Sequence, residues 1–332
     1  MNPIRTKRNR VACRALLSAA AALLSTSVVG CAGAGPPPSA VPLVQNSTTR
    51  AGANGAPWWM NPQATKSDLL YVSGVFGGDI DVYDYPQGTL VGTLTGLTRP
   101  TGMCVDKAGN VWITAVSQIM EYAHGGSSPI TTLNDTNEDS NGCSVDQRTG
   151  NLAVGNESTT QGGAGSVWIY KNAQGPATQY TVTNMVKDAA LTYDDRGNLY
   201  VAGFDQYNYA DFAELAKGGS AFTKVTLEPT INHPGGIQWD GKYVAIASRS
   251  NTDGNGAIDQ FAFTGTVGKE VGSTVLTGEN AFVNFWRQGG NVVVVDPLSD
   301  IVGYYSYAKG GMPTRTLSGP NGSFGVVVSL KK

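Results

Sequence analysis

Few residues of this 332-residue chain could carry acid–base or nucleophilic chemistry. It contains no Gly-x-Ser-x-Gly elbow, no His-Glu-x-x-His zinc motif, no phosphate-binding glycine loop and no Cys-x-x-Cys pair. It has only two histidines, His124 and His233. The sequence around His124, Ala-His-Gly-Gly, predicts a solvated turn, and for His233 a structural and a catalytic role both stay open.

A set of polar residues recurs at intervals of 41 to 47 residues, each next to the start of a β-rich segment. Its members are Arg99, Asn141, Asp188, His233, Asn280 and Asn321. If these segments are equivalent strands of a closed ring, the six side chains converge on its axis. They would then form a binding site at the mouth of a central channel. The alternative is a polar, water-filled channel that binds nothing.

Two further segments are candidate sites. The aromatic run from Tyr207 through Tyr209 to Phe212 either stacks on a sugar or peptide ligand or packs across the end of its own sheet. The run from Asn251 to Asp259 resembles the first half of a calcium loop, but Ala262 occupies the place of the bidentate glutamate. A plain polar hairpin loop is therefore the favoured interpretation of that run.

A repeat sets the elements that must position these residues. The pattern is an aspartate, a short turn with Gly-Asn, and then a run of β-branched or aromatic residues, as in Asp106-Lys-Ala-Gly-Asn-Val-Trp-Ile-Thr. Its copies are anchored at residues 68, 110, 151, 198, 242 and 291, with spacings of 42, 41, 47, 44 and 49. Six units of this length are typical of the four-stranded blades of a propeller.

The strands of one unit can be read from the second copy. They are predicted at residues 102–106, 111–115, 118–122 and 129–133, from the innermost strand outward. The first copy lacks an inner strand, and the segment 322–330 is a lone strand that resembles the inner strands. The sequence therefore predicts an all-β, six-bladed propeller over residues 56–332, whose first blade is completed by the C-terminal strand.

These repeats resemble those of the NHL-repeat and gluconolactonase-like six-bladed propellers. The resemblance rests on a Pro-x-Gly…Asp…Gly-Asn-(Val/Leu)-(Trp/Tyr) signature, clearest from Pro100 to Trp112. It implies a divalent metal, Ca²⁺ or Mg²⁺, at the channel mouth, held here by oxygens of Asn141, Asp188 and Asn280. The chain lacks the glutamate with which that family binds metal in its first blade, so the resemblance is specific for the fold and weak for the activity.

The N-terminal segment predicts export. Five basic residues within Arg5–Arg14 precede an apolar stretch, Ala15–Val29, that is shorter than the about 20 residues of a membrane-spanning helix. It ends in Val28-Val29-Gly30-Cys31, which resembles a bacterial lipobox and implies lipidation at Cys31. The alternative is an ordinary secretory signal in which Cys31 is incidental. We expect a lipoprotein signal peptide over 1–30 and a flexible Pro/Gly-rich tether over 31–55.

The remaining cysteines of the body are Cys104 and Cys143. Export favours a disulfide between them, whereas their positions in equivalent strands differ by one residue, which would point them to opposite faces. Residues 31–332 contain 18 basic and 25 acidic residues, so nothing indicates nucleic-acid binding.

The leading hypothesis is a non-enzymatic propeller that binds a ligand or protein, or acts as a scaffold, at the bacterial envelope. Its partners would be the membrane, through the anchor, and an unidentified protein or carbohydrate. The alternative is a metal-dependent lactonase-like hydrolase or a lyase with its site at the channel mouth.

Overall fold

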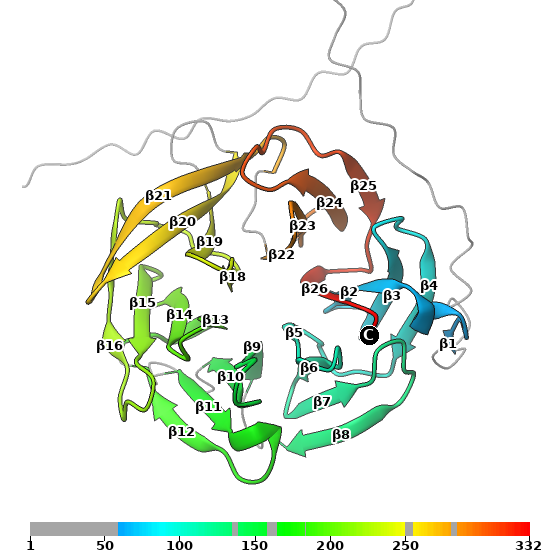
Figure 1. The fold of residues 1–332 in the computed structure, drawn as a ribbon, viewed down its shortest axis with the longest axis horizontal. Helices are drawn as coiled ribbons and strands as arrows, with labels where there is room; N and C mark the ends of the chain where they lie inside the picture. The colour runs from blue at the N-terminus through cyan, green and yellow to red at the C-terminus, as the bar shows by residue number, and fades with distance from the viewer. Residues whose placement is uncertain (1–58, 135–138, 158–164, 183, 250–254, 280–283) are drawn as a thin grey trace, which may run out of the picture. The chain divides into compact units, whose positions relative to one another are not determined.

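The structure is a computed structural model that describes residues 59–134, 139–157, 165–182, 184–249, 255–279 and 284–332. These residues form an all-β propeller of six blades around a central axis, each built on four antiparallel strands (Figure 1). Residues 1–58, which include the predicted signal, Cys31 and tether, lie outside the described part. No helix of the described residues is long and apolar enough to cross a membrane.

The first three blades are listed here from the innermost strand outward. Blade 1 consists of β26 (Ser323–Ser329), β2 (Asp68–Gly74), β3 (Asp79–Tyr85), β4 (Leu90–Thr95) and the short β1 (Trp59–Met60). Blade 2 consists of β5 (Met103–Val105), β6 (Val111–Ala115), β7 (Gln118–Tyr122) and β8 (Pro129–Asn134). Blade 3 consists of β9 (Asp139–Val145), β10 (Leu152–Glu157), β11 (Ser166–Tyr170) and β12 (Thr178–Thr181).

The other three blades follow the same order. Blade 4 consists of β13 (Lys187–Tyr193), β14 (Leu199–Phe204), β15 (Ala210–Leu215) and β16 (Thr223–Lys224). Blade 5 consists of β18 (Ile237–Trp239), β19 (Val244–Arg249), β20 (Gly256–Thr264), β21 (Val267–Leu276) and β17 (Thr226–Glu228). Blade 6 consists of β22 (Asn284–Gln288), β23 (Asn291–Asp296), β24 (Ile301–Ser306) and β25 (Arg315–Ser318). Two 3₁₀ turns, η1 (Ala64–Lys66) and η2 (Lys171–Ala173), complete the described elements.

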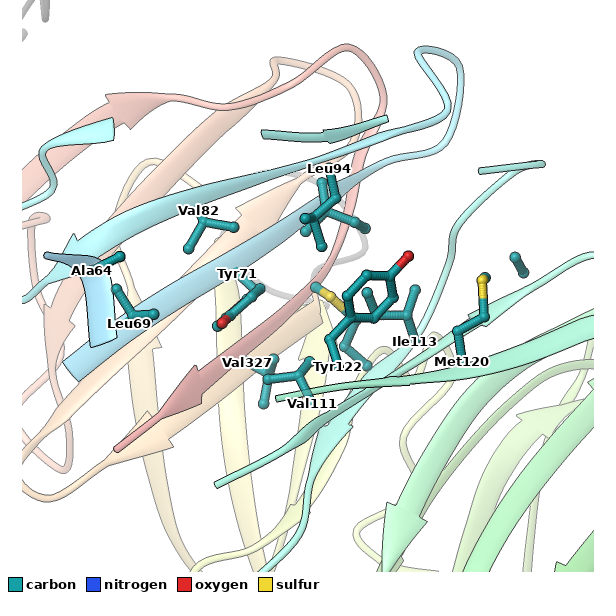
Figure 2. Packing of buried hydrophobic residues seen from close by; sticks show 13 residues of the cluster. Ala64, Leu69, Tyr71, Val82, Leu94, Val111, Ile113, Met120, Tyr122 and Val327 are labelled. Atoms are coloured by element: carbon teal, nitrogen blue, oxygen red, sulfur yellow. The ribbon is translucent and has the colours of Figure 1, made fainter. Parts of the chain in front are cut away.

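The core lies between the blades. Each described hydrophobic cluster joins two neighbouring blades, and six clusters serve the six junctions. Along β2, Leu69 and Tyr71 face blade 2, whereas Leu70 and Val72 face blade 6. Figure 2 shows the first of these junctions, where Tyr71 and Val327 meet side chains of blade 2. Strands buried on both faces explain why the repeats read as near-continuous apolar runs.

The repeated aspartate organises the turn after the inner strand. In blade 4, Asp194 accepts the backbone N–H of Asn198 at 2.8 Å and its side-chain amide at 2.8 Å. Asp106 and Asn110 form the same pair of bonds in blade 2, at 2.8 and 3.0 Å. The glycine between them, Gly109 or Gly197, has positive φ. The repeat is therefore a hairpin motif in which the aspartate satisfies the turn's backbone donors.

The ring is closed as the sequence predicts. β26 pairs with β2 in antiparallel register, from Leu69 opposite Ser329 to Gly74 opposite Ser323. In Figure 1 the red C-terminal strand lies beside the blue β2. The turn residue His124 strengthens this closure, since its ring nitrogens lie 2.7 Å from Ser329 Oγ and 2.8 Å from the Ser67 carbonyl. The prediction that His124 is solvated is therefore wrong: it is half-buried, and burial lowers its pKa.

Two short strands cover outer edges. β1 pairs antiparallel with β4 of blade 1, and β17 pairs parallel with β21 of blade 5. Trp59 therefore lies on the outer edge of blade 1. Covering an outer edge removes unpaired backbone groups that invite aggregation.

Neighbouring inner strands are linked by one recurring position, two residues before the repeated aspartate. Ser144 Oγ accepts the backbone N–H of Tyr193 at 3.0 Å, and Thr192 Oγ1 accepts that of Trp239 at 2.9 Å. Gln238 Oε1 accepts the N–H of Arg287 at 2.6 Å. Each of these side chains thus reaches the inner strand of the following blade, and we call them the inter-blade staples.

In blade 2 the same position is Cys104, which forms a disulfide with Cys143 of blade 3, with Cα atoms 5.6 Å apart. The one-residue offset therefore does not point the two side chains apart, contrary to the expectation from the sequence. Adjacent blades meet through opposite faces, so a side chain directed forward from one blade meets a side chain directed backward from the next. The offset is what brings Cys104 and Cys143 together.

Candidate functional site

The loops leading into the inner strands and the loops joining second to third strands lie on one face, which we call the loop face. The tight turns after the inner strands lie on the opposite face, the turn face. The register shows this division, because Lys187 at the start of β13 pairs with Phe204 at the end of β14. A site can therefore be built on either face or in the channel between them.

The predicted channel-mouth residues do not form one cluster in the described structure. Arg99, with φ of 49°, forms an exposed ion pair with Asp139 of blade 3 at 2.9 Å. Asn141 lines the channel, and its amide donates to Glu157 Oε1 at 2.7 Å. His233 and Asn321 are exposed on the loop face. The side chain of Asp188 and all of Asn280 lie outside the described residues.

Glycine lets neighbouring inner strands approach closely near their first residues. At Gly102, the glycine of the Pro-x-Gly signature, a Cβ would lie 2.5 Å from the Asn141 carbonyl oxygen of the next blade. A Cβ at Gly236 would lie 3.0 Å from Asn284 Oδ1, and one at Gly325 would strike the Thr101 carbonyl. Inner strands that approach this closely at three junctions need a residue without a side chain.

The predicted metal site stays a prediction, because most of its ligand side chains lie outside the described part of the chain. The described residues contain no group of three or more His, Cys, Asp or Glu side chains able to hold a metal ion. Of the three predicted ligands, Asn141 is the one whose side chain is described. In the run that resembles a calcium loop, Asn251–Gly254 lie outside the described residues, and both oxygens of Asp259 accept serine hydroxyls, Ser248 and Ser273, at 2.6 Å each.

Large apolar side chains stand exposed on the loop face. Leu298 is 85% exposed, Phe76 78%, Tyr209 71% and Tyr207 69%. All four lie in loops that join a second strand to a third, in blades 1, 4 and 6. Of the predicted aromatic run, Tyr207 and Tyr209 are thus exposed, whereas Phe212 is buried in the junction of blades 4 and 5.

These side chains are displayed by hydrogen-bonded turns. Asp205 Oδ1 accepts the N–H groups of Tyr207 and Tyr209 at 2.8 and 2.9 Å. Asp296 Oδ1 accepts the N–H of Leu298 at 2.8 Å. Phe76 N–H donates to the Asn321 carbonyl at 3.3 Å. The turns hold the apolar tips in place, which lowers the entropy that a partner must remove on binding.

One candidate acid is buried at the junction of blades 5 and 6. Glu279 accepts a hydrogen bond from the Tyr305 hydroxyl at 2.6 Å, and burial raises the pKa of its carboxyl group. Gly303 leaves room for this contact, since a Cβ there would lie 2.7 Å from the Tyr305 ring.

The channel contains a cavity of about 420 Å³ to which all six inner strands contribute. Its wall includes Trp239 and Trp286, and Trp286 packs against clusters on both sides of blade 1. The sequence indicated a site at the loop-face end of these strands, and neither tryptophan was among the predicted site residues. The signal was available, because both occupy inner-strand positions given by the repeat.

Comparisons with known proteins identify a fold and no family. No protein-family profile matches the chain, and no curated protein matches it in sequence. Among solved structures, a chain from "Crystal structure of Nidogen/Laminin Complex" matches with a TM-score of 0.60 and 15% identity, over 80% of this chain and 100% of that one. A protein of unknown function from Bacteroides caccae matches with a TM-score of 0.58 and 12% identity, over 79% of this chain and 99% of that one. Together with the strand topology, these likenesses show that the chain is a six-bladed β-propeller.

Proposed function

We propose that this chain is a non-enzymatic binding propeller, lipid-anchored through Cys31 at the bacterial envelope, whose loop face binds a partner protein. The observation that carries the proposal is the display of Phe76, Tyr207, Tyr209 and Leu298 on hydrogen-bonded turns. Several large apolar side chains presented on one face are suited to binding a protein, because aromatic anchors contribute much of the energy at protein interfaces.

Two further observations support the proposal. The Cys104–Cys143 disulfide fits a chain that folds in an oxidising compartment outside the cytoplasm. One of the similar structures comes from a complex between two proteins, so a propeller of this architecture can serve in protein recognition. The hydrolase or lyase alternative would need a convergent acid, base or metal site at the loop-face mouth, and Arg99 and Asn141 are instead engaged with Asp139 and Glu157.

Site-specific photocrosslinking tests the proposal. A photoreactive amino acid at Tyr207 or Leu298, in the full chain expressed in its own envelope, should yield one discrete protein adduct. The same amino acid at Lys309, on the opposite face, is the matched control and should yield none.

The crosslinked protein, once purified, should bind the wild-type chain and lose about tenfold or more in affinity to the Leu298→Ser and Tyr207→Ser variants. Equal adducts from both faces, or unchanged affinity of both variants, would contradict the proposal. Metal-dependent turnover of lactones by the wild-type chain would favour the alternative.

A further inference from the structure

Several polar side chains in and next to the inner strands hold the ring together. The staples Ser144, Thr192 and Gln238 are bonded to the following blade, and Asn284 Nδ2 donates to the Phe324 carbonyl at 3.0 Å. Gln147 Nε2 likewise donates to the Val105 carbonyl at 2.8 Å. Because these polar groups are bonded to neighbouring blades, the surface that lines the channel is mainly apolar.

The aromatic part of that surface is large. Trp239, Trp286, Tyr193 and Phe324 all line the cavity and are only partly buried. Partly exposed indoles inside a half-enclosed hollow are poorly hydrated, so an apolar molecule that displaces water from them gains free energy. The volume of about 420 Å³ lies within the range of roughly 300–1,000 Å³ typical of small-molecule sites.

The charged residues at the mouth of the cavity indicate which polar group a ligand would carry. Among its described lining residues the charged ones are Asp106, Lys107 and Lys332. Both carboxylate oxygens of Asp106 are engaged by Asn110 in the turn, at 2.8 and 3.0 Å. Lys107 and Lys332 are exposed on the turn face, where the channel opens. The mouth therefore offers the ammonium groups of two lysines to a ligand, while the Asp106 carboxylate is already hydrogen-bonded within its own turn.

We infer that the channel is a binding site for an amphipathic monocarboxylate, such as a fatty acid. Its apolar body would lie against Trp239 and Trp286, and its carboxylate would pair with Lys107 and Lys332 at the turn face. The inference goes beyond the proposed function, because partner binding uses the opposite face. Either proposal can fail while the other stands.

Titration of the full chain with dodecanoate, below its micelle concentration, tests the inference. Calorimetry should show saturable one-to-one binding, and dodecylamine, with the same chain and the opposite charge, should bind about tenfold more weakly. The Lys107→Glu variant should lose about fivefold in affinity for dodecanoate, whereas the Lys309→Glu control should retain it.

The position of the ligand is tested by tryptophan fluorescence. A dodecanoate brominated at its terminal carbon quenches indoles that it contacts, so part of the emission should fall with the same binding constant. That part should disappear in the Trp239→Phe/Trp286→Phe variant, which keeps apolar rings in the channel and so preserves the fold. Absence of saturation, equal binding of the amine, or quenching that survives both substitutions would each overturn the inference.

Discussion

At the scale of single residues, a buried carboxyl group links the stability of the protein to pH. Glu279 is buried beside Tyr305, and the hydroxyl donates to its carboxylate. Because burial raises the pKa of this carboxyl above the value of 4.5 expected in the unfolded chain, the folded state holds its proton more tightly. The contribution of this carboxyl to stability is therefore greatest in acid and declines as the pH rises from about 4.5 through the raised pKa.

The direction of this pH dependence predicts how the Glu279→Gln variant behaves. Glutamine keeps an acceptor for Tyr305 and removes the charge, so the variant should melt at a higher temperature than the wild type near pH 7. The difference should shrink toward about pH 4, where the wild-type carboxyl is protonated. Thermal unfolding across this range measures it, with Glu228→Gln as an exposed control. A difference that does not vary with pH would contradict the assigned cause.

At the scale of elements, the inter-blade staples show how one position of the repeat serves several chemistries. The position two residues before the repeated aspartate carries a disulfide-bonded cysteine in blade 2, hydroxyls in blades 3 and 4, and an amide in blade 5. The sequence predicted strands such as Val111–Ala115 and Gln118–Tyr122 correctly because period and turn chemistry are local. It did not predict the staples, because which faces of two blades meet depends on the closed ring.

The Thr192 staple gives a prediction with a small, isosteric change. Thr192→Val removes the hydroxyl that accepts the Trp239 N–H and leaves that part-buried donor without this partner, so the free energy of unfolding should fall by about 1 kcal/mol. Urea denaturation measures the change. Thr178→Val, at an exposed site on β12, should leave the midpoint nearly unchanged. Similar midpoints for the two variants would mean that the staple contributes little.

The disulfide is the covalent version of the staple and should matter more. It spans 39 residues, and loss of a cross-link over a loop of that length lowers stability by about 4 kcal/mol in the chain-entropy description. A Cys104→Ser/Cys143→Ser variant should unfold at a lower urea concentration, and reductant should lower the midpoint of the wild type alone. Equal sensitivity of both proteins to reductant would show that the bond is not responsible.

At the scale of the whole molecule, the ring behaves as one closed object. Among the described residues, every hydrophobic cluster lies at a junction between two blades, so the blades share their cores. The fold was predictable to this level because six repeats and one lone strand allow one closure. The candidate site was not, since Arg99 and Asn141 are held by neighbours, Asp139 and Glu157, that no repeat position identifies.

Closure predicts the effect of removing the last strand. A chain that ends at Gly322 loses β26, which uncovers β2 and breaks the junctions with blades 2 and 6. We expect loss of the single cooperative unfolding transition and aggregation through the open edge. Circular dichroism melts and size-exclusion chromatography measure both. A chain lacking only Lys331 and Lys332 should melt cooperatively, and cooperative melting of the shorter chain would refute the dependence on closure.

The pairing of β26 with β2 also has a consequence in time. A ribosome makes β2 about 250 residues before its partner, as their positions in the chain require. Until residues 323–329 are synthesised, blade 1 has no inner strand, and the nascent protein is an arc with two open ends. The first blade to be translated is thus the last to be completed. A chaperone that covers the unpaired edge of β2 would therefore be needed until β26 has been synthesised.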